Sequence, residues 1–159
     1  MLLVDTYIDV QKDGQIGLFA TKDIERGTQI WKFHKNTAQV FWKKQYLSVC
    51  MKLATPALID FIKCSYIKGG NIYFLNDNTK YISHSLSQNV AFQTERVIVA
   101  VENIMAGQEI TQNYLKSYDV GDFIFIDNLF VNPNHQEICD KLKAHFAQIG
   151  RAKSNFLVK

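Results

Sequence analysis

The sequence has few of the residues that mark irregular or cross-linked chains. It contains only 2 prolines and 8 glycines in 159 residues, which excludes collagen-like and low-complexity classes. Its 3 cysteines lie far apart, with no Cys-x-x-Cys pair and no Cys/His cluster, so we expect neither a disulfide framework nor a structural zinc site. An odd, dispersed set of thiols suits a reducing compartment.

Long apolar runs and a secretion signal are also missing. No apolar run approaches 18 residues, so we expect a soluble protein with no membrane span. The first residues carry no basic region and reach Asp5 at once, which is not typical of a signal peptide. We therefore expect a cytoplasmic location where the chain is synthesised. Export as a secreted effector, or action in a host nucleus, stays open.

An excess of charge of one sign is lacking as well. The formal net charge is +3, and residues 141–159 hold five basic residues and no acidic one, so residues 1–140 carry a net charge of −2. This balance does not predict nucleic-acid binding, and we expect no nucleic-acid partner. We interpret the basic end as a solvated helix face, with a contact surface for an acidic partner as the alternative.

Several common catalytic motifs do not occur. The chain has no Gly-x-Gly-x-x-Gly loop, no Walker loop and no Gly-x-Ser-x-Gly turn. Its 4 histidines show no metal-ligand spacing. Hydrolytic and metal chemistry are poorly supported, and we expect no metal.

Short strands and a few helices are what the chain does contain. Stretches rich in strand-forming residues predict strands over residues 2–10, 16–20, 28–33, 72–75, 89–93, 96–101 and 110–114. Helical content is expected over residues 37–51, over a helix capped by Thr55 and ended by Gly69-Gly70, and over a last helix that starts at Asn132-Pro133 and stops at Gly150.

This pattern predicts a mainly β (α+β) protein. We expect a core over residues 1–118, with a helical insert at about 37–70, and a C-terminal helical cap over 119–159 packed on that core. In the last helix, Ile138, Leu142, Phe146 and Ile149 form one apolar face.

Three ordered segments resemble the motifs of the SET-domain protein lysine methyltransferases. Residues 17–27 (GLFATKDIERG) resemble Gly-Leu-Phe-Ala-x-x-Asp-Ile-x-x-Gly, and residues 80–89 (KYISHSLSQN) resemble Arg-Phe-Ile-Asn-His-Ser-Cys-x-Pro-Asn. Residues 100–114 resemble Ala-x-x-Asp-Ile-x-x-Gly-Glu-Glu-Leu-Thr-x-Asp-Tyr. The resemblance implies a SET-domain fold of small curved sheets with a pseudoknot-like core, in a small member without the cysteine-rich zinc tail.

The resemblance also implies a reaction: methyl transfer from S-adenosylmethionine to the side-chain amine of a lysine in a protein substrate, either a histone or another protein. The cofactor carries the methyl group and the protein aligns the reactants, so no metal is needed. By motif position Tyr114 would be catalytic. Cofactor contacts are implied for Ile16, Gly17, Leu18, Tyr81, Ser83 and His84. Phe92 would line the lysine channel, and we expect an aromatic residue after Tyr114 (Tyr118, Phe123 or Phe125) to close it.

Departures from the family motifs leave a second function open. Ser83 stands where the family has asparagine, so the side chain at this position is shorter and lacks an amide group. Gln15 and Gln88 replace a glycine and a proline of the motifs. The alternative to an active enzyme is therefore a catalytically weak or inactive SET-fold module that binds a protein partner. The sequence does not set the substrate, the number of methyl groups or the oligomeric state, so an oligomer stays open.

Overall fold

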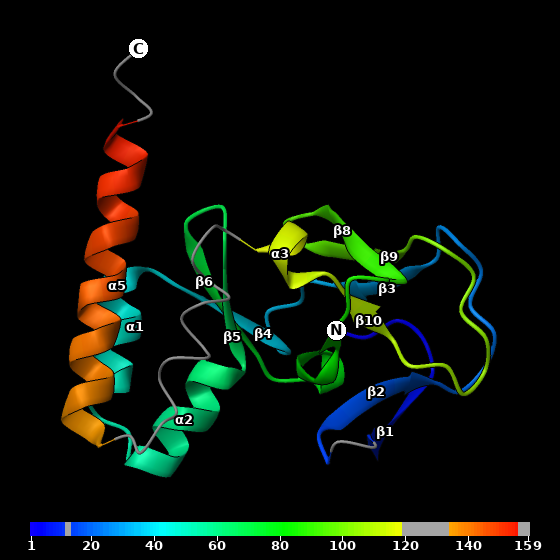
Figure 1. The fold of residues 1–159 in the computed structure, drawn as a ribbon, viewed down its shortest axis with the longest axis horizontal. Helices are drawn as coiled ribbons and strands as arrows, with labels where there is room; N and C mark the ends of the chain where they lie inside the picture. Colours follow the sequence, from blue (N-terminus) through cyan, green and yellow to red (C-terminus); the bar gives the residue numbers. More distant parts are fainter. Residues whose placement is uncertain (12–13, 119–133, 156–159) are drawn as a thin grey trace. The chain divides into compact units, whose positions relative to one another are not determined.

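Short strands dominate the first half of the protein in the computed structural model, which describes residues 1–11, 14–118 and 134–155. The chain divides into two compact units (Figure 1). The first comprises Met1–Gln39 and Leu75–Tyr118, and the second comprises Val40–Phe74 and Asp119–Lys159. The segment predicted as an insert thus falls mostly in the second unit, together with the C-terminal segment.

A hairpin opens the first unit. Strand β1 (Thr6–Val10) pairs antiparallel with β2 (Ile16–Ala20), in a register that runs from Val10 opposite Ile16 to Thr6 opposite Ala20. The other edge of β2 is bound by the segment before the last strand, because the Ile110 N–H donates to the Leu18 carbonyl at 2.7 Å. Both edges of β2 are therefore hydrogen-bonded.

The main sheet of the first unit contains a strand threaded between two earlier ones. Its order is β3-β9-β8-β10-β7, with β3 at Gln29–Lys32, β9 at Val97–Ala100, β8 at Val90–Thr94, β10 at Thr111–Gln112 and β7 at Ser83–His84. Strands β3, β9 and β8 are antiparallel, whereas β10 is parallel to both β7 and β8. Because residues 85–89 connect β7 to β8, this loop crosses β10. The crossing forms the pseudoknot-like core that the family resemblance implies.

Side-chain amides hold this crossing in place. The Asn89 side chain is 2% exposed; its Nδ2 donates to the Glu109 carbonyl at 2.7 Å and its Oδ1 accepts from the Thr111 N–H at 2.8 Å. The Gln88 Oε1 accepts from the Asn113 N–H at 3.0 Å. These bonds satisfy backbone groups that the two-residue strand β10 alone leaves unpaired.

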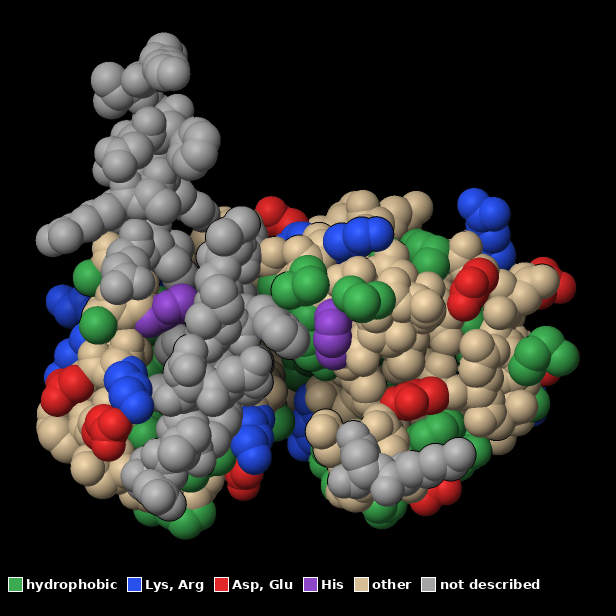
Figure 2. All heavy atoms as spheres, viewed as in Figure 1, with side chains coloured by type: hydrophobic (Ala, Val, Ile, Leu, Met, Phe, Trp, Pro, Cys, Tyr) green, Lys and Arg blue, Asp and Glu red, His purple; other side chains and the backbone are tan. Residues whose placement is uncertain are grey.

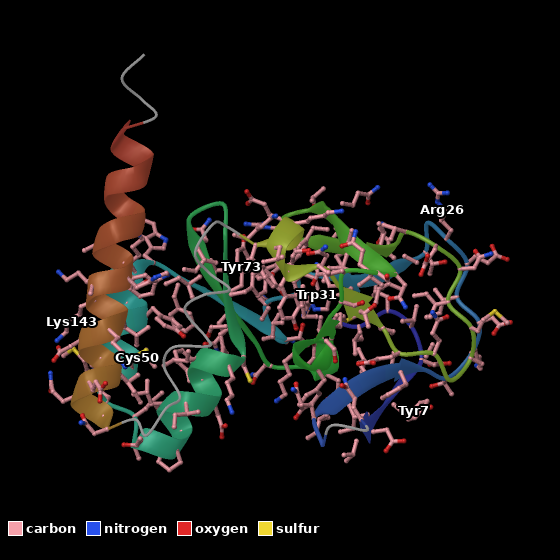
Figure 3. The ribbon with its side chains drawn as sticks, viewed as in Figure 1. Tyr7, Arg26, Trp31, Cys50, Tyr73 and Lys143 are labelled. Atoms are coloured by element: carbon pink, nitrogen blue, oxygen red, sulfur yellow. The ribbon has the colours of Figure 1, made fainter. Side chains whose placement is uncertain are left out.

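Apolar side chains fill the interior of the first unit. Trp31, labelled in Figure 3, is fully buried, and its Nε1–H donates to Asp77 Oδ2 at 3.3 Å. Ile24 and Ile104 are bridged across the two turns that precede β3 and β10.

The described strands over 16–20, 29–32, 71–75, 90–94 and 97–100 confirm the strands predicted at these places.

The second unit mixes helices with a small sheet. It contains α1 (Lys43–Cys50), α2 (Thr55–Lys63), α5 (His135–Asn155) and a sheet ordered β4-β6-β5, with β4 at Ala38–Phe41, β6 at Asn71–Leu75 and β5 at Ser65–Lys68. The prediction that helix continues to Gly69-Gly70 is wrong. These glycines form the turn of the β5–β6 hairpin at φ +59° and +81°, a conformation that favours glycine.

Three predicted helix ends also differ from the structure. Helical content was expected over residues 37–51, but Ala38–Phe41 form strand β4 and α1 begins only at Lys43. Ala54 is the N-cap of α2, so Thr55 is the first helical residue rather than the cap. Helix α5 continues to Asn155, so the predicted stop at Gly150 is wrong. A glycine costs only about 1 kcal/mol within a helix, and good helix formers follow it here. The predicted cap, Asn132-Pro133, lies outside the described residues; Asn134 Oδ1 accepts from the Glu137 N–H at 2.9 Å and caps the helix.

One apolar core joins the elements of the second unit. Helix α5 lies beside α1 (Figure 1), and the buried core residues are Tyr46, Cys50, Leu58, Ile62, Ile67, Ile72, Ile138, Cys139, Leu142 and Phe146. The apolar face predicted from Ile138, Leu142 and Phe146 is therefore confirmed. Tyr46 stacks on Phe61 with ring centroids 4.9 Å apart. The C-terminal helix thus packs on the helices of the insert.

Candidate functional site

Tyr114 follows strand β10, at the crossing in the first unit, and is the first residue of helix α3 (Tyr114–Ser117). Asn113 caps this helix, because its Oδ1 accepts from the Leu115 N–H at 3.1 Å. The Tyr114 hydroxyl donates to the Ile82 carbonyl, and the Tyr114 N–H donates to Nδ1 of His84 at 3.1 Å. Tyr114 is thus bound to both residues that flank Ser83.

Aromatic rings gather around Tyr114. The Tyr114 ring lies 5.3 Å from His84 and 5.0 Å from Tyr118, and Phe92 meets Tyr118 edge-on at 6.1 Å between centroids. We call these four residues the aromatic cluster. Burial, together with the negative charge of Glu109, raises the pKa of Tyr114 to about 12. The phenol therefore stays protonated at neutral pH and acts as a hydrogen-bonding group.

A buried glutamine borders the aromatic cluster. Gln112 is 1% exposed, and its Oε1 accepts from the Tyr118 hydroxyl at 3.3 Å. Its Nε2 has no hydrogen-bond partner within residues 1–11, 14–118 and 134–155. An unsatisfied buried donor costs roughly 1–3 kcal/mol, which makes this amide nitrogen an exception among the buried polar groups of the described residues.

Three polar side chains meet beside the backbone of Gly17. Gln11 Nε2 donates to Ser83 Oγ at 2.6 Å and also to Glu109 Oε1. A Cβ at position 17 would lie 2.7 Å from Gln11 Nε2 and 2.8 Å from Glu109 Oε1. Only glycine leaves room for this arrangement, which we call the polar cluster (Gln11, Ser83 and Glu109).

The remaining predicted cofactor residues lie on β2 and in η1 (Asn78–Tyr81), a 3-10 helix. The Ile16 side chain is 47% exposed, whereas Leu18 is fully buried and held by the core. Tyr81 is half-buried, and the Lys80 ammonium lies 5.2 Å from the centroid of its ring. Phe123 and Phe125 lie outside the described residues, so their predicted place at the channel stays a prediction.

Sequence reasoning missed three residues of this region. Gln11 precedes the first turn and belongs to none of the three motif segments, so no sequence signal pointed to it. Gln112 occupies a variable position of its motif. Glu109 lies within the third motif segment, but the motif alone does not show that its carboxylate accepts from Gln11 or that its charge acts on Tyr114. Long-range contacts of this kind are visible only in the folded chain.

In the described parts of the chain, no group of three or more His, Cys, Asp or Glu residues could hold a metal ion. No helix there is both long enough and apolar enough to cross a bilayer. Cys50, Cys64 and Cys139 form no disulfide in the structure.

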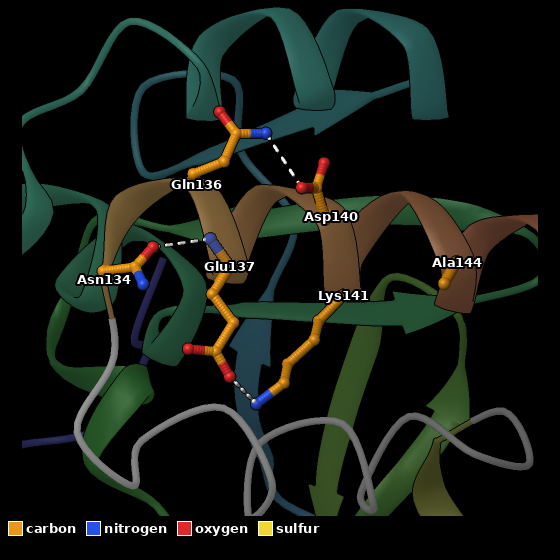
Figure 4. A pocket seen from close by; sticks show the side chains of 6 residues that line it. All are labelled: Asn134, Gln136, Glu137, Asp140, Lys141 and Ala144. Carbon is orange, nitrogen blue, oxygen red and sulfur yellow. Dashed lines mark hydrogen bonds and ion pairs between the residues drawn. The ribbon is translucent and has the colours of Figure 1, made fainter.

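A shallow pocket lies on one side of α5 (Figure 4). Its residues are distant in sequence from those of the aromatic cluster and the polar cluster. Its lining consists of Asn134, Gln136, Glu137, Asp140, Lys141 and Ala144. Their polar groups pair with one another: Lys141 with Glu137 at 2.8 Å, and Gln136 with Asp140 at 2.9 Å. Lys143 also pairs with Asp140, at 3.1 Å. Two basic residues of the predicted basic end are therefore neutralised by acidic residues of the same helix.

Charges are mixed on the surface as well. On the face shown in Figure 2, basic and acidic side chains of the described residues are interspersed, as are the hydrophobic ones. A stretch of one sign that would attract a phosphate backbone is not seen on that face among these residues.

The sequence matches the SET domain family over residues 15–115. The chain therefore belongs to the SET domain family, as the three motif segments predicted. A search of curated proteins finds no match. The family membership, the threaded strand and the position of Tyr114 agree with one another.

Solved structures share the fold at low identity. One is a humanized mutant of Polycomb Repressive Complex 2 from Chaetomium thermophilum bound to the inhibitor GSK126, with 18% identity and a TM-score of 0.53 over 72% of this chain. Another is the complex named ctPRC2 in an autoinhibited conformation bound to S-adenosylmethionine, with 18% identity and a TM-score of 0.55 over 72% of this chain. The alignments cover 15% and 16% of those chains, so this protein spans a small part of their length. The likeness shows the SET fold.

Proposed function

We propose that this protein transfers a methyl group from S-adenosylmethionine to the side-chain amine of a lysine in a protein substrate. The observation that carries the proposal is Tyr114, whose hydroxyl is fixed to the Ile82 carbonyl inside an aromatic cluster, in a chain of the SET domain family. The ctPRC2 structure, part of which shares this fold, is bound to S-adenosylmethionine, which supports the choice of cofactor.

The aromatic cluster suits a lysine side chain. Phe92, Tyr114 and Tyr118 offer apolar faces to its methylene groups. Burial of the amine among these rings favours its neutral, nucleophilic form, because desolvation lowers the pKa of an ammonium group. Since the Tyr114 hydroxyl hydrogen is used by Ile82, the Tyr114 oxygen is the acceptor that can orient an amine N–H. The residues thus align the amine.

The polar cluster fits the cofactor. Because Gly17 has no Cβ, the side chains of Gln11 and Glu109 lie against it, and together with Ser83 they place an amide, a carboxylate and a hydroxyl beside the backbone of β2. When bound, S-adenosylmethionine supplies an activated methyl group on a positively charged sulfur. The Glu109 carboxylate favours positive charge in this region.

Incubation with radiolabelled cofactor tests the proposal. The purified chain should transfer label to lysine residues of a mixed protein preparation that includes histones, and Tyr114→Phe should abolish most of the transfer. No transfer to any protein, from a folded chain, would contradict it. Action in a reducing, cytoplasmic compartment is part of this proposal, and its motive is that the three cysteines form no disulfide.

A SET-fold module that binds a protein partner without catalysis is the second candidate. It is favoured by the Gln11 and Glu109 side chains, which lie against Gly17, and by Leu86 and Leu115, which are 73% and 62% exposed. Calorimetric titration with S-adenosylmethionine separates the two candidates. Micromolar binding supports the enzyme, and no binding at millimolar cofactor supports the module.

A further inference from the structure

Exposed apolar side chains gather on the β1–β2 hairpin. Ile8, Val10 and Ile16 are 46%, 65% and 47% exposed. They share one face of the hairpin, because Val10 lies opposite Ile16 and Ile8 lies opposite Leu18. Contiguous exposed apolar side chains on a small unit mark a surface that contacts another molecule.

The outer edge of β1 presents backbone groups to solvent. Among the described residues, β1 is paired in its sheet with β2 alone (Figure 1). Leu18 of β2 turns its backbone groups away from β1, because its carbonyl accepts from the Ile110 N–H. In an antiparallel pair, opposite residues both face the shared ladder or both face away from it. The N–H and C=O groups of Ile8, opposite Leu18, and those of Thr6 and Val10 therefore point to the outer edge.

A strand edge of this kind is a template for pairing with another strand. We propose that β1 pairs antiparallel with β1 of a second copy of this chain, about a twofold axis at Ile8. The Ile8 N–H of each copy then donates to the Ile8 carbonyl of the other, and the Thr6 N–H donates to the Val10 carbonyl. The two hairpins join into one four-stranded sheet. This inference does not depend on the proposed function.

The charges of β1 select an axis at Ile8. An axis at Asp9 would place the Asp9 carboxylates of the two copies opposite each other, and an axis at Tyr7 would place Asp9 opposite Asp5. Like charges that lie directly opposite destabilise a strand pair. An axis at Asp9 would also need the Val10 N–H, which already donates to Asp9 Oδ1 at 2.7 Å.

An axis at Ile8 makes the strand complementary to itself. Ile8 is the middle residue of β1, so all five residues of the strand are paired. Asp9 then lies opposite Tyr7 of the second copy, and no two carboxylates of the strand face each other. Ile8 meets Ile8 of the second copy, and Val10 meets Thr6, so exposed apolar side chains are covered on both copies. A second copy therefore fits this edge in charge as well as in polarity.

Sedimentation equilibrium of the full chain measures the assembly directly. The wild type should form a dimer with a Kd on the order of 10 μM, as expected of a small, transient interface. Ile8→Lys places a charge at the centre of the pairing and should raise this Kd at least about tenfold. Met51→Lys is the matched control: it also replaces an exposed apolar side chain, but at the end of α1 in the second unit, and should leave the Kd unchanged. Circular dichroism and thermal melting check that each variant folds.

Disulfide cross-linking tests the register. With the axis at Ile8, Tyr7 of one copy lies opposite Asp9 of the other in a non-hydrogen-bonded pair, with about 4.5 Å between their Cα atoms. A mixture of Tyr7→Cys and Asp9→Cys chains should therefore give a cross-linked dimer when glutathione disulfide oxidises the two thiols and is itself reduced to two glutathione molecules. Either variant alone should give at most a trace, as should the wild type with its native cysteines.

Each outcome decides for or against the pairing. A wild-type chain that stays monomeric at about 200 μM, some twenty times the expected Kd, overturns the proposal. A dimer that Ile8→Lys does not weaken, or that cross-links through Tyr7→Cys or Asp9→Cys alone as well as through the mixture, also overturns it. A dimer that is weakened by Ile8→Lys but not by Met51→Lys, with cross-linking specific to the mixture, supports it.

Discussion

The hydroxyl group of Tyr114 donates a hydrogen bond to the backbone carbonyl of Ile82, 32 residues earlier in the chain. The bond crosses the threaded part of the fold, because Ile82 directly precedes β7 and Tyr114 follows β10 by two residues. The crossing of β10 by the loop of residues 85–89 thus helps to fix the orientation of the Tyr114 phenol. A phenolic oxygen that donates its hydrogen can also accept a hydrogen bond.

Removal of this hydroxyl should damage turnover more than cofactor binding. Tyr114→Phe keeps the ring contacts with His84 and Tyr118 but removes the group that orients the amine. We expect kcat to fall on the order of 10²-fold, the usual cost of one preorganised polar group in a transition state. The Kd for S-adenosylmethionine, measured by calorimetry, should change less than about threefold. Equal losses in kcat and affinity would instead make Tyr114 a structural residue.

Stability should decline at alkaline pH. Burial raises the pKa of Tyr114 from 10 to about 12 and that of the Cys50 thiol from 9 to about 12. Because the folded state favours the protonated forms, this stabilisation is complete below pH 9 and is lost as pH rises toward 12. Urea unfolding at pH 8, 10 and 11.5 should show a falling free energy of unfolding. Cys50→Ala should reduce the decline, and an unchanged slope in that variant would contradict the assignment to Cys50.

Asn89 should be critical for folding. Asn89→Ala leaves the Glu109 carbonyl and the Thr111 N–H without the partners that its amide provides. Two buried unsatisfied groups predict a loss of about 2–5 kcal/mol in the free energy of unfolding. Asn76→Ala, at an exposed asparagine, is the matched control and should cost less than about 0.5 kcal/mol. Comparable losses of stability in both variants would show that the crossing of β10 by residues 85–89 does not depend on Asn89.

Gly17→Ala should weaken binding of S-adenosylmethionine strongly while it lowers the stability of the fold only a little. The new methyl group would meet the far ends of Gln11 and Glu109, which are flexible enough to move. The fold should therefore survive with a loss of about 1–2 kcal/mol. Affinity for S-adenosylmethionine should fall by at least about tenfold, because the polar cluster is displaced. Thermal melting and calorimetry measure the two effects, and a variant that binds the cofactor normally would refute this role of Gly17.

Replacement of Gln112 should lower methyl transfer without lowering the stability of the fold. Gln112→Leu, combined with Tyr118→Phe, removes both partners of their hydrogen bond and the amide nitrogen that lacks one among the described residues. Such a pair of replacements is expected to be neutral or stabilising, by up to about 2 kcal/mol. Methyl transfer should decrease, since the buried donor is lost. A double variant that is clearly less stable than the wild type would indicate that the amide is satisfied in the folded protein.

The sequence predicted much of the fold of the first unit. Alternating strand formers and turn residues predicted β2, β8 and β9 within one or two residues of their bounds. The segment Ser65–Lys68 was predicted as helix, because the helical spacing of α2 continues into it. In the folded chain these residues pair with Asn71–Leu75, and this tertiary pairing outweighs the local preference.

The candidate site was only partly accessible from the sequence. Motif positions pointed to Tyr114 and Ser83, and the structure brings Tyr114 next to both neighbours of Ser83. Gln11 and Glu109 are 98 residues apart, and nothing local indicates that their side chains meet. Their pairing depends on the contact of the segment before β10 with β2, where Glu109 bridges to Phe19, and no periodicity reveals this contact.

The most direct test follows the methyl group itself. The full chain is incubated with S-adenosylmethionine that carries a deuterated methyl group, together with histones and a cell extract, and the modified residues are located by mass spectrometry. We predict the heavy methyl label on lysine side chains with the wild-type chain and at most a trace with Tyr114→Phe. Equal labelling by both chains, or no labelled lysine with a wild-type chain that is folded and binds the cofactor, would contradict the proposed function.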